Sequence, residues 1–64
     1  MAKKIALTKA GLAESEVILE RVELDKENGV WVYEVEFAKG YTEYDVYVDA
    51  TDGTILKYKT DIDD

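Results

Sequence analysis

From residue 17 onward, four runs of alternating apolar and polar residues are separated by three short connections that each contain a glycine. The runs are VILERVELDK, VWVYEVEFA, YTEYDVYVDA and TILKYK, and the connections are KENG, KG and ATDG. Alternation is typical of strands with one buried face, and glycine supplies the backbone angles that tight hairpins need. The pattern predicts an antiparallel sheet in which each strand pairs with the next one along the chain.

The first residues follow a different period. The segment AKKIALTKAG places Ala2, Ile5, Ala6 and Ala10 near the helical repeat, and Gly11 is a natural residue to end a helix. A helix of about nine residues is marginal in isolation, so packing must stabilise it. We therefore expect an α+β fold, with one short N-terminal helix packed on a four-stranded antiparallel meander sheet.

The pairing of the strands can be predicted by requiring the large apolar residues to share a face. If Lys39-Gly40 is the loop of the second hairpin, Phe37 pairs with Thr42. Across the first hairpin, the same requirement pairs Leu24 with Trp31. The face under the helix then contains four aromatic residues that we expect in the core: Trp31, Tyr33, Phe37 and Tyr44.

The opposite face is expected to combine acidic and apolar side chains. Glu34 is predicted to lie opposite Asp45, and Glu36 opposite Glu43, and like charges at such positions cost stability. Arg21 offsets only part of this repulsion. Apolar and aromatic residues beside charged ones are typical of a partner surface, the alternative being a sheet that simply faces solvent. The candidate partner surface consists of Val32, Tyr47, Leu56, Tyr58, Glu34 and Asp45.

The segment VDATDGTIL places two aspartates around a glycine, which raises the possibility of a calcium loop. If Gly53 were the sixth residue of an EF-hand loop, the first, third and twelfth positions would hold a valine, an alanine and a lysine, and none of these fits. Asp and Gly are also the residues that tight turns prefer. We therefore expect a hairpin turn at this segment.

Four carboxylates of the same sheet face form a second candidate site: Glu34, Glu36, Glu43 and Asp45. Paired acids can hydrolyse glycosides, and converging carboxylates can hold a divalent cation. An open sheet face offers no pocket that excludes water. A solvated acidic face is therefore the expected interpretation, with weak cation binding as the alternative.

One helix residue does not fit the apolar pattern. Lys9 falls inside the apolar stripe of the helix, and Glu20 is expected on the inner face of the first strand, opposite Val35. An ion pair between Lys9 and Glu20 at the edge of the helix–sheet contact would explain both positions. The alternative is that both side chains extend outward to solvent.

Composition argues against several classes of function. The 64 residues include no histidine and no cysteine, and Ser15 is the single serine. The usual general base, the thiolate zinc site and an activated serine are therefore absent. With 15 acidic and 8 basic residues, a net charge of −7 argues against a nucleic-acid partner. We expect no enzymatic activity, no catalytic residue, no metal, no cofactor and no membrane insertion.

The segments WVYEVEF and EYDVYVDATDGTIL resemble the PepSY domain family. The family pattern is a short alanine-rich helix ending in a small residue and glycine, an extended strand, a YEVE-like strand and a VDAxTGxI-like segment. In this chain Asp52 replaces the threonine before the glycine, and the chain begins inside the usual first helix, so a preceding turn is expected to be missing. The fold motif is carried by Tyr33, Val35, Val48, Asp49, Gly53 and Ile55.

This resemblance implies a non-catalytic module over residues 2–59, followed by an acidic tail, residues 60–64, that is expected to fray. PepSY domains occur in propeptides of secreted metallopeptidases and in envelope regulators, and they are proposed to inhibit or modulate peptidases. The implied partner is a peptidase or another envelope protein, and the implied location is extracellular or in the cell envelope of a parent protein. The alternative is a structural or spacer module that forms a homodimer through the outer sheet face or an edge. The segment TILKYKT is a candidate edge for pairing, although its lysines can also prevent pairing.

Overall fold

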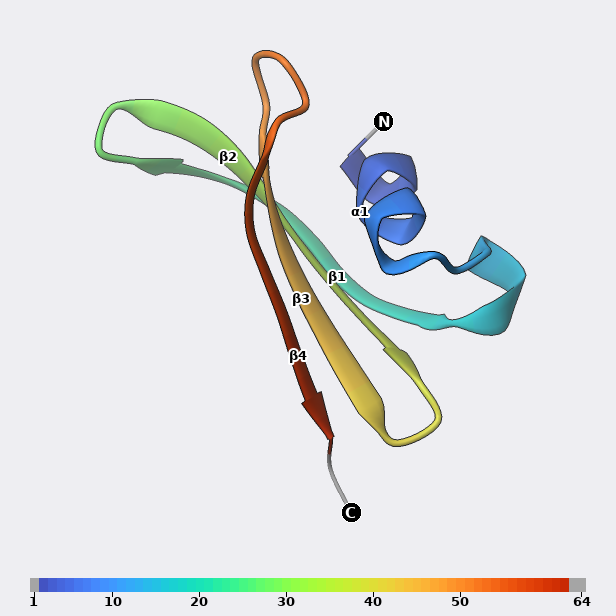
Figure 1. Cartoon of the computed structure of the whole chain (residues 1–64). Coiled ribbons are helices and arrows are strands. Elements are labelled where there is room, and N and C mark those ends of the chain that lie inside the picture. Colours follow the sequence, from blue (N-terminus) through green and yellow to red (C-terminus); the bar gives the residue numbers. More distant parts are fainter. Residues whose placement is uncertain (1, 63–64) are drawn as a thin grey trace.

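The computed structural model describes residues 2–62 and consists of one helix on one face of a four-stranded antiparallel sheet (Figure 1). The sheet order is β1-β2-β3-β4, so each strand pairs with its neighbour in sequence. The predicted α+β meander is therefore confirmed. The elements are helix α1 (Ala2–Ala10), a single 3-10 turn η1 (Glu14–Glu16), and strands β1 (Ile18–Glu27), β2 (Val30–Lys39), β3 (Thr42–Asp49) and β4 (Ile55–Ile62).

Helix α1 ends in a Schellman motif. The Leu12 N–H donates to the Leu7 carbonyl at 3.0 Å, and the Gly11 N–H donates to the Thr8 carbonyl at 3.1 Å. Gly11 adopts a φ of 75°, a left-handed conformation that glycine tolerates best. This conformation is typical of the residue that follows a helix, which is the position predicted for Gly11. Neither helical segment within residues 2–62 has the length and apolar character needed to cross a membrane.

The pairing of β2 with β3 differs from the prediction by two residues. Lys39 pairs with Thr42, so the loop is Gly40-Tyr41 and not Lys39-Gly40. Phe37 consequently lies opposite Tyr44, and its predicted pairing with Thr42 was wrong. Because a shift of two residues keeps each side chain on its face, the predicted faces of both strands still hold.

The pairing of β1 with β2 is also displaced by two residues. Leu24 pairs with Tyr33, not with Trp31, because the hairpin turn is Asn28-Gly29, with φ values of 51° and 80°. Beyond Arg21 the register shifts again, because Glu20 is an extra residue in a bulge and has no partner on β2. Its predicted position opposite Val35 was therefore wrong.

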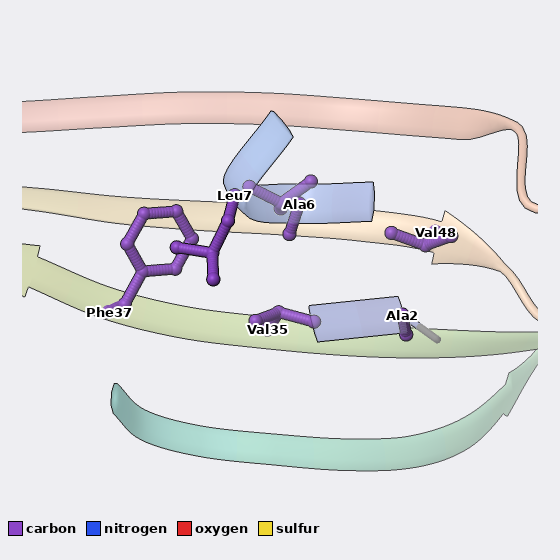
Figure 2. Close-up of a cluster of buried hydrophobic side chains, with 7 residues drawn as sticks. Ala2, Ala6, Leu7, Val35, Phe37 and Val48 are labelled. Carbon is purple, nitrogen blue, oxygen red and sulfur yellow. The ribbon is translucent and has the colours of Figure 1, made fainter. Parts of the chain in front are cut away.

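The core lies between α1 and the two central strands. Figure 2 shows the side chains from α1 over those from β2 and β3. Phe37 is completely buried, and Tyr33 and Tyr44 pack against this cluster from its margins. The pattern of the helix had not identified Leu7 as a core residue. The buried cluster consists of Ala2, Ala6, Leu7, Val35, Phe37, Val46 and Val48.

Trp31 does not belong to this core, contrary to the prediction. Its side chain is on the inner face but is 50% exposed. The hairpin that joins β1 to β2 extends well beyond the short helix, which cannot cover it (Figure 1). Val22 and Leu24 of β1 are also exposed on this face, because α1 packs mainly against β2 and β3 and leaves the edge strand β1 uncovered.

The expected ion pair between Lys9 and Glu20 does not form. The Lys9 Nζ lies 5.6 Å from the centre of the Tyr58 ring, on the β4 side of the helix. Glu20 is exposed in β1, at the other edge of the sheet. Of the expected acidic tail, residues 60–62 belong to β4, and residues 63 and 64 lie outside the described part of the chain.

Candidate functional site on the outer sheet face

The outer face, opposite α1, carries an apolar cluster near the β1–β2 hairpin. We define this outer cluster as Val30, Val32, Tyr47 and Leu56, which line a shallow hollow. Val32 is only 4% exposed although α1 is on the other side of the sheet, so its neighbours must cover it. Leu56 is 51% exposed at the same place. The structure thus brings together three residues of the predicted partner surface, Val32, Tyr47 and Leu56.

Tyr58 was also predicted on this surface, but it lies on the inner face. Val48 pairs with Ile55, whereas Tyr47 pairs with Lys57, so β4 contains an extra residue, Leu56. This bulge reverses the alternation of β4, and Tyr58 is placed opposite Val46. Its ring centroid is 6.5 Å from that of Tyr44, under the helix side of the sheet.

Lys57 takes a position beside the outer cluster as a consequence of the same bulge. Its Nζ lies 5.5 Å from the centre of the Tyr47 ring, within the range of a cation–π contact. Burial, together with the charges of Asp45 and Glu34, raises the pKa of the Tyr47 hydroxyl. The tyrosine therefore stays neutral and joins the apolar cluster to the charged part of the face.

Arg21 organises the charged part of the outer face. Its Nη2 lies 2.8 Å from Glu34 Oε1, its Nε lies 2.7 Å from Glu36 Oε1, and its Nη1 lies 3.4 Å from Glu23 Oε2. The Glu34 side chain is only 18% exposed. The sequence predicted that Arg21 offsets the repulsion only in part, and it did not identify the guanidinium as a shared partner of three carboxylates.

Asp45 lies beside this network, but Arg21 forms no ion pair with it. It pairs across the sheet with Glu36 and Lys59, whereas the predicted partner Glu34 lies opposite Tyr47. The Oδ1 atom of Asp45 is buried and has no hydrogen-bond partner among the described residues. Burial, followed by the nearby charge of Glu34, raises the pKa of the Asp45 carboxyl to about 6.

The second predicted like-charge pair was also displaced. Glu43 lies opposite Ala38, and Asp45 takes the expected place of Glu43 opposite Glu36. One carboxylate oxygen from each of Glu34, Glu36 and Asp45 lies within 4.8 Å of the others, which is a suitable spacing for a cation. The guanidinium of Arg21 already binds two of these three groups. The arrangement therefore neutralises part of the charge on the outer face.

The segment VDATDGTIL forms the connection between β3 and β4, as the sequence predicted. Asp49 Oδ1 accepts from the Thr51 N–H at 2.8 Å, and Asp52 Oδ1 accepts from the Thr54 N–H at 2.9 Å. The Gly53 N–H donates to the Asp49 carbonyl at 2.8 Å. Both aspartates thus hold the turn through backbone amides.

The residues that carry the fold motif occupy structural positions. Val35 and Val48 are buried under α1, and Tyr33 and Ile55 pack against that core. The remaining two, Asp49 and Gly53, form the turn between β3 and β4. The motif residues therefore form the helix–sheet contact and one connection.

Comparisons with known proteins bear on the same residues. Residues 2–59 match the family model described as PepSY, peptidase propeptide and YPEB domain. The uncharacterized protein Spy1430 of Streptococcus pyogenes serotype M6 is 39% identical over 56 residues, which is 88% of this chain but only 43% of that protein. No solved structure matches the chain. The match extends from α1 into β4, and the chain belongs to the PepSY family of peptidase propeptide and YPEB domains.

Proposed function

We propose that this chain is a non-catalytic binding module that inhibits or modulates a peptidase, in the manner of a propeptide, by docking through its outer sheet face. Membership of the peptidase propeptide family supports this function. The observation that carries it is the outer cluster, where Leu56 and Val30 are 51% and 40% exposed beside Tyr47. The partner is a peptidase or another envelope protein, and the module acts outside the cell or in the envelope as part of a parent protein.

The physical argument rests on the composition of this face. Apolar side chains exposed together and surrounded by charged groups are typical of protein interfaces. The network around Arg21 supplies the charged border, with Glu34 and Glu36 held in fixed positions. The net charge of −7 favours a partner surface with basic residues around an apolar centre.

The experiment combines capture with an inhibition assay. The immobilised module is used to capture peptidases from a bacterial secretome, and each captured peptidase is purified and assayed for proteolysis with increasing module. The variant Tyr47→Asp/Leu56→Asp places two charges in the outer cluster. The matched control Tyr41→Asp/Ile62→Asp changes two residues that are 78% and 71% exposed away from this cluster.

The module is expected to lower the peptidase activity, the outer-cluster variant to require at least about tenfold more protein for the same effect, and the control to match the parent. Unchanged peptidase activity at all module concentrations would refute the function. Equal inhibition by the parent and by Tyr47→Asp/Leu56→Asp would show that the outer cluster is not the docking surface.

Self-association is the alternative function, and the same outer cluster supports it. A small domain gains stability when it buries an exposed apolar surface against a second copy. Sedimentation velocity distinguishes the two functions. A dimer that forms with increasing concentration and is lost in Tyr47→Asp/Leu56→Asp favours a structural or spacer module, and a monomer at all concentrations excludes it.

A further inference from the structure

The eight basic side chains of the protein differ in whether they bind a carboxylate. Three of them bind carboxylates: Lys3 pairs with Glu14 at 2.9 Å, Lys39 pairs with Glu16 at 3.2 Å, and Arg21 holds the outer-face network. Lys26 lies over the ring of Trp31 at the β1–β2 hairpin. The remaining four lysines are on α1 and β4. Like Lys26, they have no carboxylate at ion-pair distance within residues 2–62: Lys4, Lys9, Lys57 and Lys59.

A groove with apolar walls runs between α1 and the start of β4. It is lined by Lys4, Ile5, Thr8, Lys9 and Ile55. The buried side chains of α1 lie over β2 and β3, which leaves β4 at the flank of the helix (Figure 2). Further along β4, Tyr58 is also exposed on this inner side.

Strand β4 forms one edge of the sheet and pairs only with β3 within the described chain. In an antiparallel edge strand, alternate backbone N–H and C=O groups point away from the sheet and can pair with an added strand. The side chains of an added strand would alternate between the groove beside α1 and the outer face. On the outer face they would meet Lys57 and Lys59, which lie opposite Tyr47 and Asp45.

We infer that β4 and the groove beside α1 bind an extended partner segment of alternating acidic and apolar residues, which adds to the sheet as a fifth strand. The inference rests on the proposed binding function and adds a second contact at the edge of the sheet, where the bound segment is acidic, whereas the partner surface on the outer face is basic. The apolar residues of the segment contact Ile5 and Ile55, and its acidic residues lie beside Lys57 and Lys59. Lys4 and Lys9 border the groove and bind further carboxylates of the partner.

The charge distribution selects this occupant over others. A second copy of β4 in the antiparallel register centred on Tyr58 would place Lys57 beside Lys59, which is unfavourable for neighbouring strands. The opposite edge, β1, carries four acidic residues and contains the bulge at Glu20, which interrupts regular pairing. An acidic segment is therefore accepted at β4 and repelled at β1.

The test uses a short synthetic peptide in which glutamate and valine alternate. It is titrated into the ¹⁵N-labelled protein, and the amide shifts report both the affinity and the binding surface. The variant Lys57→Glu/Lys59→Glu reverses the charge of the edge. The control Lys26→Glu/Lys39→Glu makes the same change in net charge away from β4. A peptide with lysine in place of glutamate tests the sign of the charge.

The largest shifts are expected in β4 and in residues 4–9, with affinity at least about tenfold weaker for Lys57→Glu/Lys59→Glu and for the lysine peptide. The control is expected to bind as the parent does. Equal binding by parent and Lys57→Glu/Lys59→Glu, shifts centred on β1, or no binding of the acidic peptide would overturn the inference.

The peptidase assay separates this inference from the proposed function. If the module inhibits a peptidase but the acidic peptide does not bind at β4, the edge inference is wrong and the proposed function stands. If the acidic peptide binds at β4 but no peptidase is inhibited, the edge is a binding site and the proposed function is wrong.

Discussion

The rings of Phe37 and Tyr44 lie opposite each other on β2 and β3 and stack with their centroids 4.9 Å apart and an angle of 8° between their planes. Phe37 is completely buried, and Tyr44 covers it at the margin of the core. The pair therefore joins the two central strands directly beneath α1.

Replacing Phe37 with alanine is expected to lower the free energy of unfolding by about 3–5 kcal/mol, because it removes a buried aromatic side chain and leaves a cavity. That loss is comparable to the total stability of many small domains. The half-exposed Trp31 is the control, and Trp31→Ala is expected to cost about 1 kcal/mol. Urea denaturation followed by circular dichroism measures both, and a larger loss for Trp31→Ala would contradict the assigned core.

The alternating pattern of β2 and β3 was sufficient to predict which face each residue occupies, but not which residues pair. Phe37 faces the helix whether it pairs with Thr42 or with Tyr44, because the two registers differ by two residues. The actual turn, Gly40-Tyr41, decides between them. Apolar periodicity contains no information that separates these turns.

The outer face was predicted less completely, since bulges leave no clear trace in composition. The extra residue Leu56 turns Tyr58 inward and Lys57 outward, and neither change follows from the alternation of TILKYK. The exposure of Trp31 likewise depends on how far a nine-residue helix reaches across a longer hairpin. The bulge in β4 and the exposure of Trp31 depend on how the helix and the strands pack together, and not on the sequence of a single segment.

Arg21 is expected to matter most when the carboxylates around it are charged. Arg21→Gln removes the ion pairs to Glu34 and Glu36, so their mutual repulsion and that of Asp45 are no longer offset. The melting temperature is therefore expected to fall more at pH 7 than at pH 5, where part of this charge is lost. Lys26→Gln is the control, and equal shifts in melting temperature at both pH values for Arg21→Gln would show that the effect of Arg21 does not depend on the charge of these carboxylates.

Asp45 is expected to make the protein more stable as the pH falls from about 7 to about 4. The pKa of the Asp45 carboxyl is about 6 in the folded protein, against an ordinary value of 3.8, so between these two pH values the folded state binds more protons than the unfolded state. The group thus destabilises the folded protein when charged, by about 1–2 kcal/mol at pH 7 after allowance for partial exposure. Asp45→Asn should recover this energy.

Urea denaturation of the parent and Asp45→Asn at a series of pH values tests this expectation. The parent should gain stability toward pH 4, and the variant should be flatter and more stable at pH 7. At lower pH Asp52 contributes in the opposite direction, because hydrogen bonds from the Thr54 side chain and amide lower its pKa, and its stabilisation is lost as it becomes protonated. A parent that loses stability between pH 7 and pH 5 would contradict the assigned environment of Asp45.

Gly53 is expected to be the most sensitive of the hairpin glycines, because two separate constraints act on it. Its φ is 80°, and a Cβ atom at this position would lie 3.0 Å from Ile5 Cδ1. Gly40 also has a positive φ, of 61°, but a Cβ there would meet nothing within 4 Å. Gly40→Ala should therefore lose only the backbone contribution, about 1 kcal/mol, and Gly53→Ala should lose more.

The difference between the two variants is attributed to Ile5, and a double-mutant cycle can isolate it. Ile5→Val removes Cδ1, the atom that an added Cβ at Gly53 would displace. If the contact is responsible, Gly53→Ala should cost less in the Ile5→Val background than in the parent, and urea denaturation of the four proteins gives the coupling energy. Additive losses would mean that backbone strain alone accounts for Gly53, and that the turn and α1 are energetically independent at this point.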